Sequence, residues 1–252
     1  MRAEPPFGAY AIIGGSGLQS LSGLIVDSRH SPLTPYGTTS GPINSGLIGG
    51  KRVFFIARHG VEHTIAPHAI NYRANIWALR EVGARSLVSV ATVGGIQTRF
   101  GPGTLVVPDQ IVDYTWGRDN TFSGAGDPVK HVDFTHPFSL PLRTAILNAA
   151  SRCKFAPVDG GVYAATQGPR LESAAEINRI DRDGGNVVGM TGMPEAVLAR
   201  ELQLEYAMIA VVVNSAAGRG ESAQGIRFDE LASIAQLSMQ NVETILKELI
   251  LQ

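Results

Sequence analysis

Side chains suited to binding an oxyanion follow four short apolar runs of this sequence. They are Ser16, Arg58, His59, Thr92 and Thr191. Ser16 lies in a glycine-rich turn whose backbone N–H groups can also face an anion. A guanidinium such as that of Arg58 suits bidentate contact with phosphate. If the four strand ends converge, the side chains form a phosphate cradle; taken singly, each hydroxyl could instead be a cap or turn residue.

The turn Gly14-Gly15-Ser16-Gly17 does not complete a nucleotide-binding motif. No Gly-Lys-Ser/Thr follows it, so it is not a Walker loop, and the third glycine of a dinucleotide fingerprint is missing. Gly17-Leu18 after Ser16 also rules out the Gly-x-Ser-x-Gly elbow of a serine hydrolase. Alone, this turn indicates a tight bend as readily as an anion site.

His59, His63 and His68 could suggest a metal site. Zinc needs at least three ligands with an ordered second shell, and Pro67 interrupts this group. CxxC and HExxH are absent from the sequence. We therefore expect no metal and no cofactor.

Two further polar residues could recognise a ligand rather than an anion. Glu172 closes the segment Gln167–Glu172, between a predicted strand and a predicted helix, and could accept from a ligand N–H. Asn214 ends the most apolar strand, and its carboxamide both donates and accepts, as a purine edge with O6 and N7 requires. The alternatives are a helix-start carboxylate and a turn residue.

The elements that must position these residues alternate between strands and helices. Continuous apolar runs predict strands buried on both faces at Tyr10–Ile13, Arg52–Ala57, Leu87–Ala91, Leu105–Val107, Val158–Ala164, Val187–Gly189 and Ala207–Val213. Helical periodicity predicts helices at Asn71–Val82, Leu142–Ala150, Ser173–Arg182, Pro194–Leu202 and Phe228–Leu251. This alternation favours an α/β fold in three layers. Pro108–Pro137 reads as a long polar loop, and such loops are usually functional.

Composition narrows the class of protein. The 252 residues are 44% hydrophobic and 17% charged, which predicts one domain over residues 1–252 with a sizeable core. A net charge of −1 and the absence of basic or long apolar runs predict neither nucleic-acid nor membrane partners. A single cysteine, Cys153, and no signal-peptide pattern in the first ten residues predict a cytoplasmic protein.

The chain resembles the trimeric purine nucleoside phosphorylase and methylthioadenosine phosphorylase family along essentially its whole length. The matching stretches are Ile12–Leu18, Arg58–Gly60, Pro67–Leu79, Pro102–Asp113, Gln167–Glu172 and Gly189–Arg200. The run Gly-Met-Thr-Gly-Met-Pro-Glu at 189–195 is highly specific, and the segment at 67–75 is similar to the methylthioadenosine branch. The resemblance implies a three-layer α/β/α fold around a mixed, partly barrel-like sheet, an active trimer, and phosphate as co-substrate.

The resemblance also implies a role for individual residues. Ser16, Arg58, His59, Thr92 and Thr191 match the family's phosphate-binding positions. Met190 matches the residue beneath the ribose, and Leu171 and Glu172 match the base pocket. His131 matches a residue donated to the 5′ pocket of the neighbouring subunit.

Two positions depart from the methylthioadenosine pattern. Members of that branch carry Asp-x-Asp where this chain has Asn214-Ser215-Ala216, and asparagine there is similar to the enzymes that act on 6-oxopurines. Phe228 stands fourteen residues after Asn214, where those enzymes carry a histidine for the 5′-hydroxyl. A phenyl ring suits an apolar methylthio group. Together the two departures indicate S-methyl-5′-thioinosine as the substrate.

The resemblance implies phosphorolysis of an N-glycosidic bond without a covalent enzyme intermediate. Asn214, Arg58 and His59 are the residues expected to take part in catalysis. Three alternatives stay open from the sequence: phosphorolysis of methylthioadenosine, phosphorolysis of inosine or guanosine, and a nucleoside-binding protein without activity. An intact phosphate-binding set speaks against the last.

Overall fold

The computed structural model describes residues 7–124, 126, 128 and 130–252, with the backbone alone at 228–230. Its strands are β1 (Ala9–Gly14), β2 (Ile25–His30), β3 (Ile43–Ile48), β4 (Lys51–Ala57), β5 (Ala84–Gly95), β6 (Leu105–Val107), β7 (Gln110–Asp113), β8 (Val158–Asp159), β9 (Val162–Ala165), β10 (Val187–Gly189) and β11 (Glu205–Ser215). The helices are α1 (Tyr72–Glu81), α2 (Leu140–Arg152), α3 (Ala174–Arg182), α4 (Gly192–Glu201) and α5 (Phe228–Leu251).

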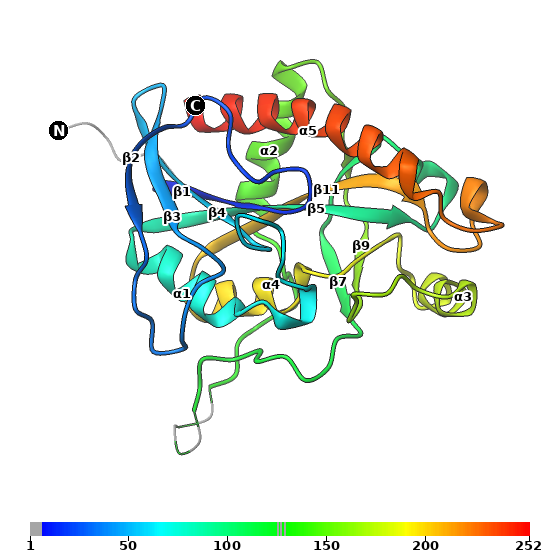
Figure 1. Ribbon diagram of the computed structural model, residues 1–252, viewed down its shortest axis with the longest axis horizontal. Helices are drawn as coiled ribbons and strands as arrows, with labels where there is room; N and C mark the ends of the chain where they lie inside the picture. The colour runs from blue at the N-terminus through cyan, green and yellow to red at the C-terminus, as the bar shows by residue number, and fades with distance from the viewer. Residues whose placement is uncertain (1–6, 125, 127, 129) are drawn as a thin grey trace.

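The sheet is covered by helices on both faces because its central strands are apolar on both sides. Along β11, Met208 and Val212 pack in a cluster with α1 and α4, whereas Ile209 and Val211 pack in a second cluster with α2 and α5. Figure 1 shows the same arrangement, with α2 and α5 above the sheet and α1 and α4 below it. The predicted α/β fold in three layers is confirmed.

The strands form one mixed, branched sheet. β1 pairs in parallel with β4 and β5, and β5 pairs in parallel with β11 but antiparallel with β10. From β5 one arm continues through β10, β9 and β7, and the other through β11, β6 and β8. The predicted mixed sheet is confirmed. Its partly barrel-like form corresponds to a branch at β5, from which both arms of the sheet begin.

Parallel pairing brings the predicted site residues to one edge of the sheet. The carboxyl ends of β1 and β4 lead to the glycine-rich turn and to Arg58 and His59. Thr92 and Asn214 lie near the carboxyl ends of β5 and β11. In open α/β sheets, ligands bind outside the carboxyl ends of the strands. The fold therefore provides the convergence that the phosphate cradle requires.

Each predicted strand overlaps a strand of the structure, but three strands were missed, among them the mostly buried β3. β2, β3 and β7 were not predicted; β7 lies inside Pro108–Pro137, so that the segment is not a continuous loop. The expected strand Val158–Ala164 is two strands, broken at Gly160 and Gly161, which both have positive φ angles. The single domain over residues 1–252 stays a prediction, since residues 1–6 lie outside the description. Within the described residues, no helix has the length and apolar character to span a membrane.

Candidate active site

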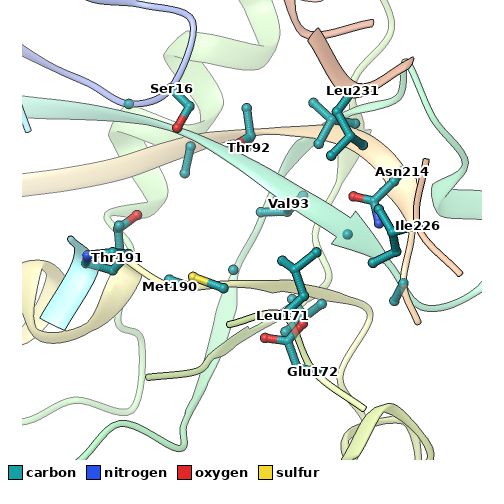
Figure 2. Close-up of a pocket in the computed structure, with 18 of the residues that line it drawn as sticks. Ser16, Thr92, Val93, Leu171, Glu172, Met190, Thr191, Asn214, Ile226 and Leu231 are labelled. Carbon is teal, nitrogen blue, oxygen red and sulfur yellow. The ribbon is translucent and has the colours of Figure 1, made fainter. Parts of the chain in front are cut away.

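One cavity at this edge of the sheet collects nine of the predicted residues. They are Ser16, Arg58, His59, Thr92, Leu171, Glu172, Met190, Thr191 and Asn214. Figure 2 shows Ser16, Thr92 and Thr191 toward one end and Asn214, Leu171 and Glu172 toward the other, with Met190 between. The cavity thus has a hydroxyl-rich end and an end with a carboxylate and a carboxamide.

The three hydroxyl groups come from three different local settings. Thr92 lies within β5 rather than after it, because β5 is longer than the apolar run that predicted it. Thr191 is the residue that precedes α4, yet its side chain makes no capping hydrogen bond to that helix. Ser16 Oγ lies 3.3 Å from Nε2 of His63. The helix-cap alternative is therefore excluded for the Thr191 side chain.

Arg58 is a fully buried cation at the floor of the cavity, paired with a buried carboxylate. Its Nε donates to Oε1 of Glu195 at 2.5 Å, and a terminal nitrogen donates to Oε2 at 3.2 Å. Further N–H groups donate to the Val90 carbonyl and to Ser89 Oγ, at 2.9 and 2.7 Å. Of its five N–H groups, one remains for an anion. Glu195 thus occupies the edge of the guanidinium that could donate two parallel hydrogen bonds, which the sequence analysis had assigned to phosphate.

Glu195 is a charged residue beneath the cavity that the sequence analysis did not identify. Its side chain also accepts from Ser89 Oγ at 3.1 Å and from the Tyr206 hydroxyl at 3.0 Å. It stands in an otherwise apolar stretch of α4 and is 1% exposed. A carboxylate in an apolar helical segment needs a buried partner, and that was the available signal.

The approach of Arg58 to the turn requires glycine at position 15. A Cβ placed on Gly15 would lie 2.5 Å from the Val90 carbonyl oxygen and 2.8 Å from an Arg58 terminal nitrogen. The backbone N–H of Arg58 donates to the Gly14 carbonyl at 2.9 Å, which joins the turn to the end of β4. The glycine-rich turn and the segment that begins at Arg58 are therefore held as one unit.

His59 is buried beside this cation and is neutral at physiological pH. Its Nδ1 lies 2.8 Å from the Ile65 carbonyl oxygen, which can only accept, so Nδ1 carries the proton. Burial first, and then the Arg58 charge, lower the pKa of His59 from 6.5 to about 4. The other ring nitrogen, Nε2, therefore keeps its lone pair and can accept a hydrogen bond from an O–H group.

The other end of the cavity presents hydrogen-bonding groups that are already oriented. Thr166 Oγ1 donates to Oε1 of Glu172 at 2.6 Å, which leaves Oε2 to accept from a ligand. Asn214 Nδ2 donates to the Ser215 carbonyl at 2.6 Å and keeps one N–H and its oxygen. Ala216, 2% exposed, lies in the same wall and adds no polar group.

Met190 forms the middle of the cavity through close packing on the loop after β9. A Cβ on Gly168 would lie 2.5 Å from Met190 Sδ, and Gly168 has a φ of +60°. Both the space and the left-handed backbone conformation demand glycine there. This packing joins the segment with Leu171 and Glu172 to the segment with Met190 and Thr191.

The described residues do not place two of the predicted site residues at the cavity. His131 is exposed and does not line it, which leaves its role toward a neighbouring subunit a prediction. Phe228 begins α5, and its side chain lies outside the described residues. Ile226 and Leu231, which the sequence did not single out for the site, supply apolar surface instead. A second hollow of about 660 Å³ shares Ser16, Thr92, Val213 and Leu231 with the cavity and runs along α5.

The histidines and carboxylates of the described segments include no group of three arranged to hold a metal ion. The rings of His59 and His63 lie 4.7 Å apart, but a third ligand does not join them there.

Comparison with known proteins identifies the family. Residues 9–251 match the model described as "Phosphorylase superfamily". A Xanthomonas campestris protein named as a probable S-methyl-5′-thioinosine phosphorylase is 50% identical over 96% of both chains. A 6-oxopurine nucleoside phosphorylase of Pyrococcus furiosus is 41% identical, over 92% of this chain and 88% of the relative.

Solved structures agree with these relatives. Methylthioadenosine phosphorylase from Schistosoma mansoni, in complex with adenine, superposes with a TM-score of 0.91. It is 30% identical, and the match covers 96% of this chain and 91% of that one. With the hydroxyl-rich and carboxamide ends of one cavity in place, the chain belongs to the phosphorylase superfamily, and within it to the purine nucleoside and methylthioadenosine phosphorylases.

Proposed function

We propose that the protein catalyses phosphorolysis of S-methyl-5′-thioinosine to hypoxanthine and 5-methylthioribose 1-phosphate, a reaction of purine salvage. The observation that carries this proposal is that Asn214 and Glu172 both line one end of a cavity whose other end holds three hydroxyl groups. The name borne by the Xanthomonas relative supports the same substrate.

Phosphate binds at the end formed by Ser16, Thr92 and Thr191, and an oxygen of it attacks C1′ as the bond to the purine breaks. Arg58 supplies positive charge from beneath, with one N–H directed to the anion. Neutral His59 accepts a hydrogen bond from the protonated oxygen of phosphate through Nε2. Positioning of the reactants and stabilisation of the departing base supply the catalysis.

The base end selects a 6-oxopurine. Oε2 of Glu172 accepts from N1–H, a donor that hypoxanthine has and adenine lacks. Asn214 donates its remaining N–H to O6 or N7, where negative charge develops as the base leaves. A carboxylate at position 216, which could accept from a 6-amino group, is replaced by a methyl. These contacts favour hypoxanthine over adenine as the leaving group.

The 5′ end favours a methylthio group over a hydroxyl. Ile226 and Leu231 present apolar surface to the cavity. Phe228, at the first position of α5, is assigned to the same end from the family resemblance alone. Burial of sulfur and methyl against such surface is favourable, whereas a hydroxyl would need a hydrogen-bond partner.

The active form that we propose is a homotrimer in the cytoplasm, in which His131 reaches the 5′ end of the neighbouring subunit's cavity. Trp116 and Leu140, 72% and 66% exposed, flank the segment that carries His131. Exposed large apolar side chains of this kind suit burial between subunits.

The experiment is phosphate-dependent release of free base from methylthioinosine, methylthioadenosine, inosine and adenosine, compared side by side. We expect hypoxanthine from methylthioinosine to appear fastest, and only in the presence of phosphate. Release of base without phosphate, or from none of the four nucleosides, would contradict the proposal.

A further inference from the structure

Arg118, in the segment between β7 and α2, makes six hydrogen bonds directly behind the cavity wall. One terminal nitrogen donates to the carbonyls of Met190 and Met193, at 2.8 and 2.6 Å, and lies 3.3 Å from the Tyr72 hydroxyl. The other donates to the carbonyls of Thr166 and Gln167, at 3.2 and 2.8 Å. Nε donates to Oε1 of Gln167 at 3.2 Å. All five N–H groups are thereby used.

These acceptors belong to the segments that form the two ends of the cavity. Thr166 and Gln167 begin the loop that carries Glu172, and Thr166 itself holds the Glu172 carboxylate. Met190 and Met193 flank Thr191 in the sequence, and Thr191 lies at the hydroxyl-rich end. One planar guanidinium therefore joins the two loops through rigid, diverging donors.

Arg118 does not itself line the cavity, and its hydrogen bonds point to the protein rather than to a ligand. It is half-buried, its guanidinium lies 5.5 Å from the centre of the Tyr72 ring, and the ion pairs found among the described residues do not include it. A cation satisfied by four backbone carbonyls costs desolvation without Coulombic compensation from a carboxylate. Fold stability alone is a weak reason for such an arrangement.

We propose that Arg118 is a positioning residue that fixes the distance between the segment that binds the base and the segment that binds ribose and phosphate. The inference rests on the proposed function. Attack on C1′ requires the purine and the phosphate to be held at a set separation, and a displacement of about 1 Å can lower the rate on the order of 10²-fold. Apart from Arg118, the two loops are joined at their starts by the pairing of β9 with β10 and by the hydrogen bond from the Thr166 N–H to the Gly189 carbonyl at 2.8 Å. Beyond that point, packing of Met190 on Gly168 links them.

The test compares Arg118→Ala, Arg118→Lys and wild type in steady-state phosphorolysis of methylthioinosine. We expect Arg118→Ala to lower kcat and to raise the nucleoside KM, with a loss in kcat/KM on the order of 10²-fold. The phosphate KM should change much less, because Ser16, Thr92 and Arg58 lie on other segments. Arg118→Lys should be intermediate, since an ammonium reaches only some of the carbonyls.

Chemical rescue separates positioning from general damage to the fold. Added millimolar guanidinium should restore part of the kcat of Arg118→Ala, whereas urea at the same concentration should not. Asp119→Ala is the matched control: it removes the neighbouring exposed ion pair with Arg73, 2.5 Å long, and no contact to either loop. Its kinetics should equal those of wild type. If Arg118→Ala does not fold, Arg118→Lys carries the same comparison.

Unchanged nucleoside kinetics in a folded Arg118 variant overturn the inference. A loss that guanidinium does not restore, together with an equal rise in the phosphate KM, also overturns it. Either result in an enzyme whose wild type splits methylthioinosine leaves the proposed function standing. Failure of the wild type to split any nucleoside contradicts the proposed function instead.

Discussion

At the scale of single residues, the site depends on a buried charge pair. Arg58 and Glu195 are both almost fully excluded from solvent, and removal of one partner leaves the other charge unpaired. Breaking such a pair costs about 3–5 kcal/mol of folding free energy. Loss of stability could therefore hide the effect of Arg58 on phosphate in a single substitution.

The first prediction separates these two effects. Arg58→Ala should raise the phosphate KM and lower stability, whereas the double variant Arg58→Ala/Glu195→Gln should recover stability but keep the raised phosphate KM. Denaturant unfolding and initial rates measure the two quantities. Arg152→Ala, which breaks only an exposed ion pair with Glu248, is the control. An ordinary phosphate KM in the double variant would remove Arg58 from phosphate binding.

The second prediction concerns pH and His59. Its folded pKa of about 4 lies below the ordinary 6.5, so the unfolded chain binds the proton more tightly. The stabilisation is fully present above pH 6.5 and is lost as the pH falls toward 4, by about 3 kcal/mol. Denaturant titrations at several pH values give the free energy of unfolding as a function of pH. This free energy should fall with decreasing pH in wild type and should fall less steeply in His59→Gln.

The pH window in which Glu176 loses its stabilising effect lies lower than that of His59, and the two overlap only between pH 4.5 and about pH 4. The Arg170 guanidinium and a backbone N–H lower the pKa of Glu176 from 4.5 to about 2. Its contribution is therefore lost only below pH 4.5. If the free energy of unfolding depends on pH equally in wild type and His59→Gln between pH 6.5 and pH 5, His59 is not the group that causes the loss of stability.

The sequence identified cavity-lining residues at the ends of buried strands, but it did not identify their tertiary partners. Ser16, Thr92 and Asn214 could be found because each lies at or near the carboxyl end of an apolar run. Glu195 pairs with Arg58 across 137 positions of sequence, and no local pattern states that pairing. Arg118 was passed over for the same reason, since its acceptors are backbone carbonyls of other segments.

At the scale of elements, continuous apolar runs located most strands of the core, but not β3, whose apolar positions are interrupted by polar residues and glycine, nor the exposed β2. β6 and β10 match their predicted bounds, since both are buried throughout. β2 is mostly exposed along its length, and it forms by pairing with β3 rather than by burying a hydrophobic face. Strands of this kind carry little periodic signal.

The third prediction belongs to the start of α5. Phe228→His should weaken methylthio substrates and favour those with a 5′-hydroxyl, because a polar ring replaces apolar surface. One methyl-sized group is worth about 1–3 kcal/mol, so the ratio of methylthioinosine to inosine kcat/KM should fall by roughly 10–200-fold at most. Leu237→His, at an exposed position of the same helix, is the control. If the ratio of methylthioinosine to inosine kcat/KM does not change, Phe228 is a core residue and not part of the 5′ pocket.

At the scale of the whole molecule, the fourth prediction concerns assembly. If His131 completes a neighbouring cavity, activity depends on the oligomer. Sedimentation at assay concentration should give a mass of three chains of 26.7 kDa. Dilution that dissociates the trimer should lower the specific activity. A fully active monomer would contradict the assigned place of His131.

The whole molecule also shows why the base is the decisive question. The fold, the hydroxyl-rich end and Met190 offer no group that distinguishes one purine base from another, so they do not choose among substrates. That choice falls to Asn214, Glu172 and the missing carboxylate at Ala216. An unpaired buried polar group costs about 1–3 kcal/mol, and two such mismatches against adenine can reach discrimination on the order of 10⁴-fold.

The most direct test is kcat/KM of the wild-type protein for methylthioinosine and for methylthioadenosine under the same conditions. The account predicts a preference for methylthioinosine on the order of 10²–10⁴-fold. Asn214→Asp should erode that preference without fully admitting the adenine substrate, because Ala216 still lacks a carboxylate; Asn148→Asp, on an exposed position of α2, should leave it unchanged. Equal efficiencies for the two substrates, or a preference for methylthioadenosine, would contradict the account.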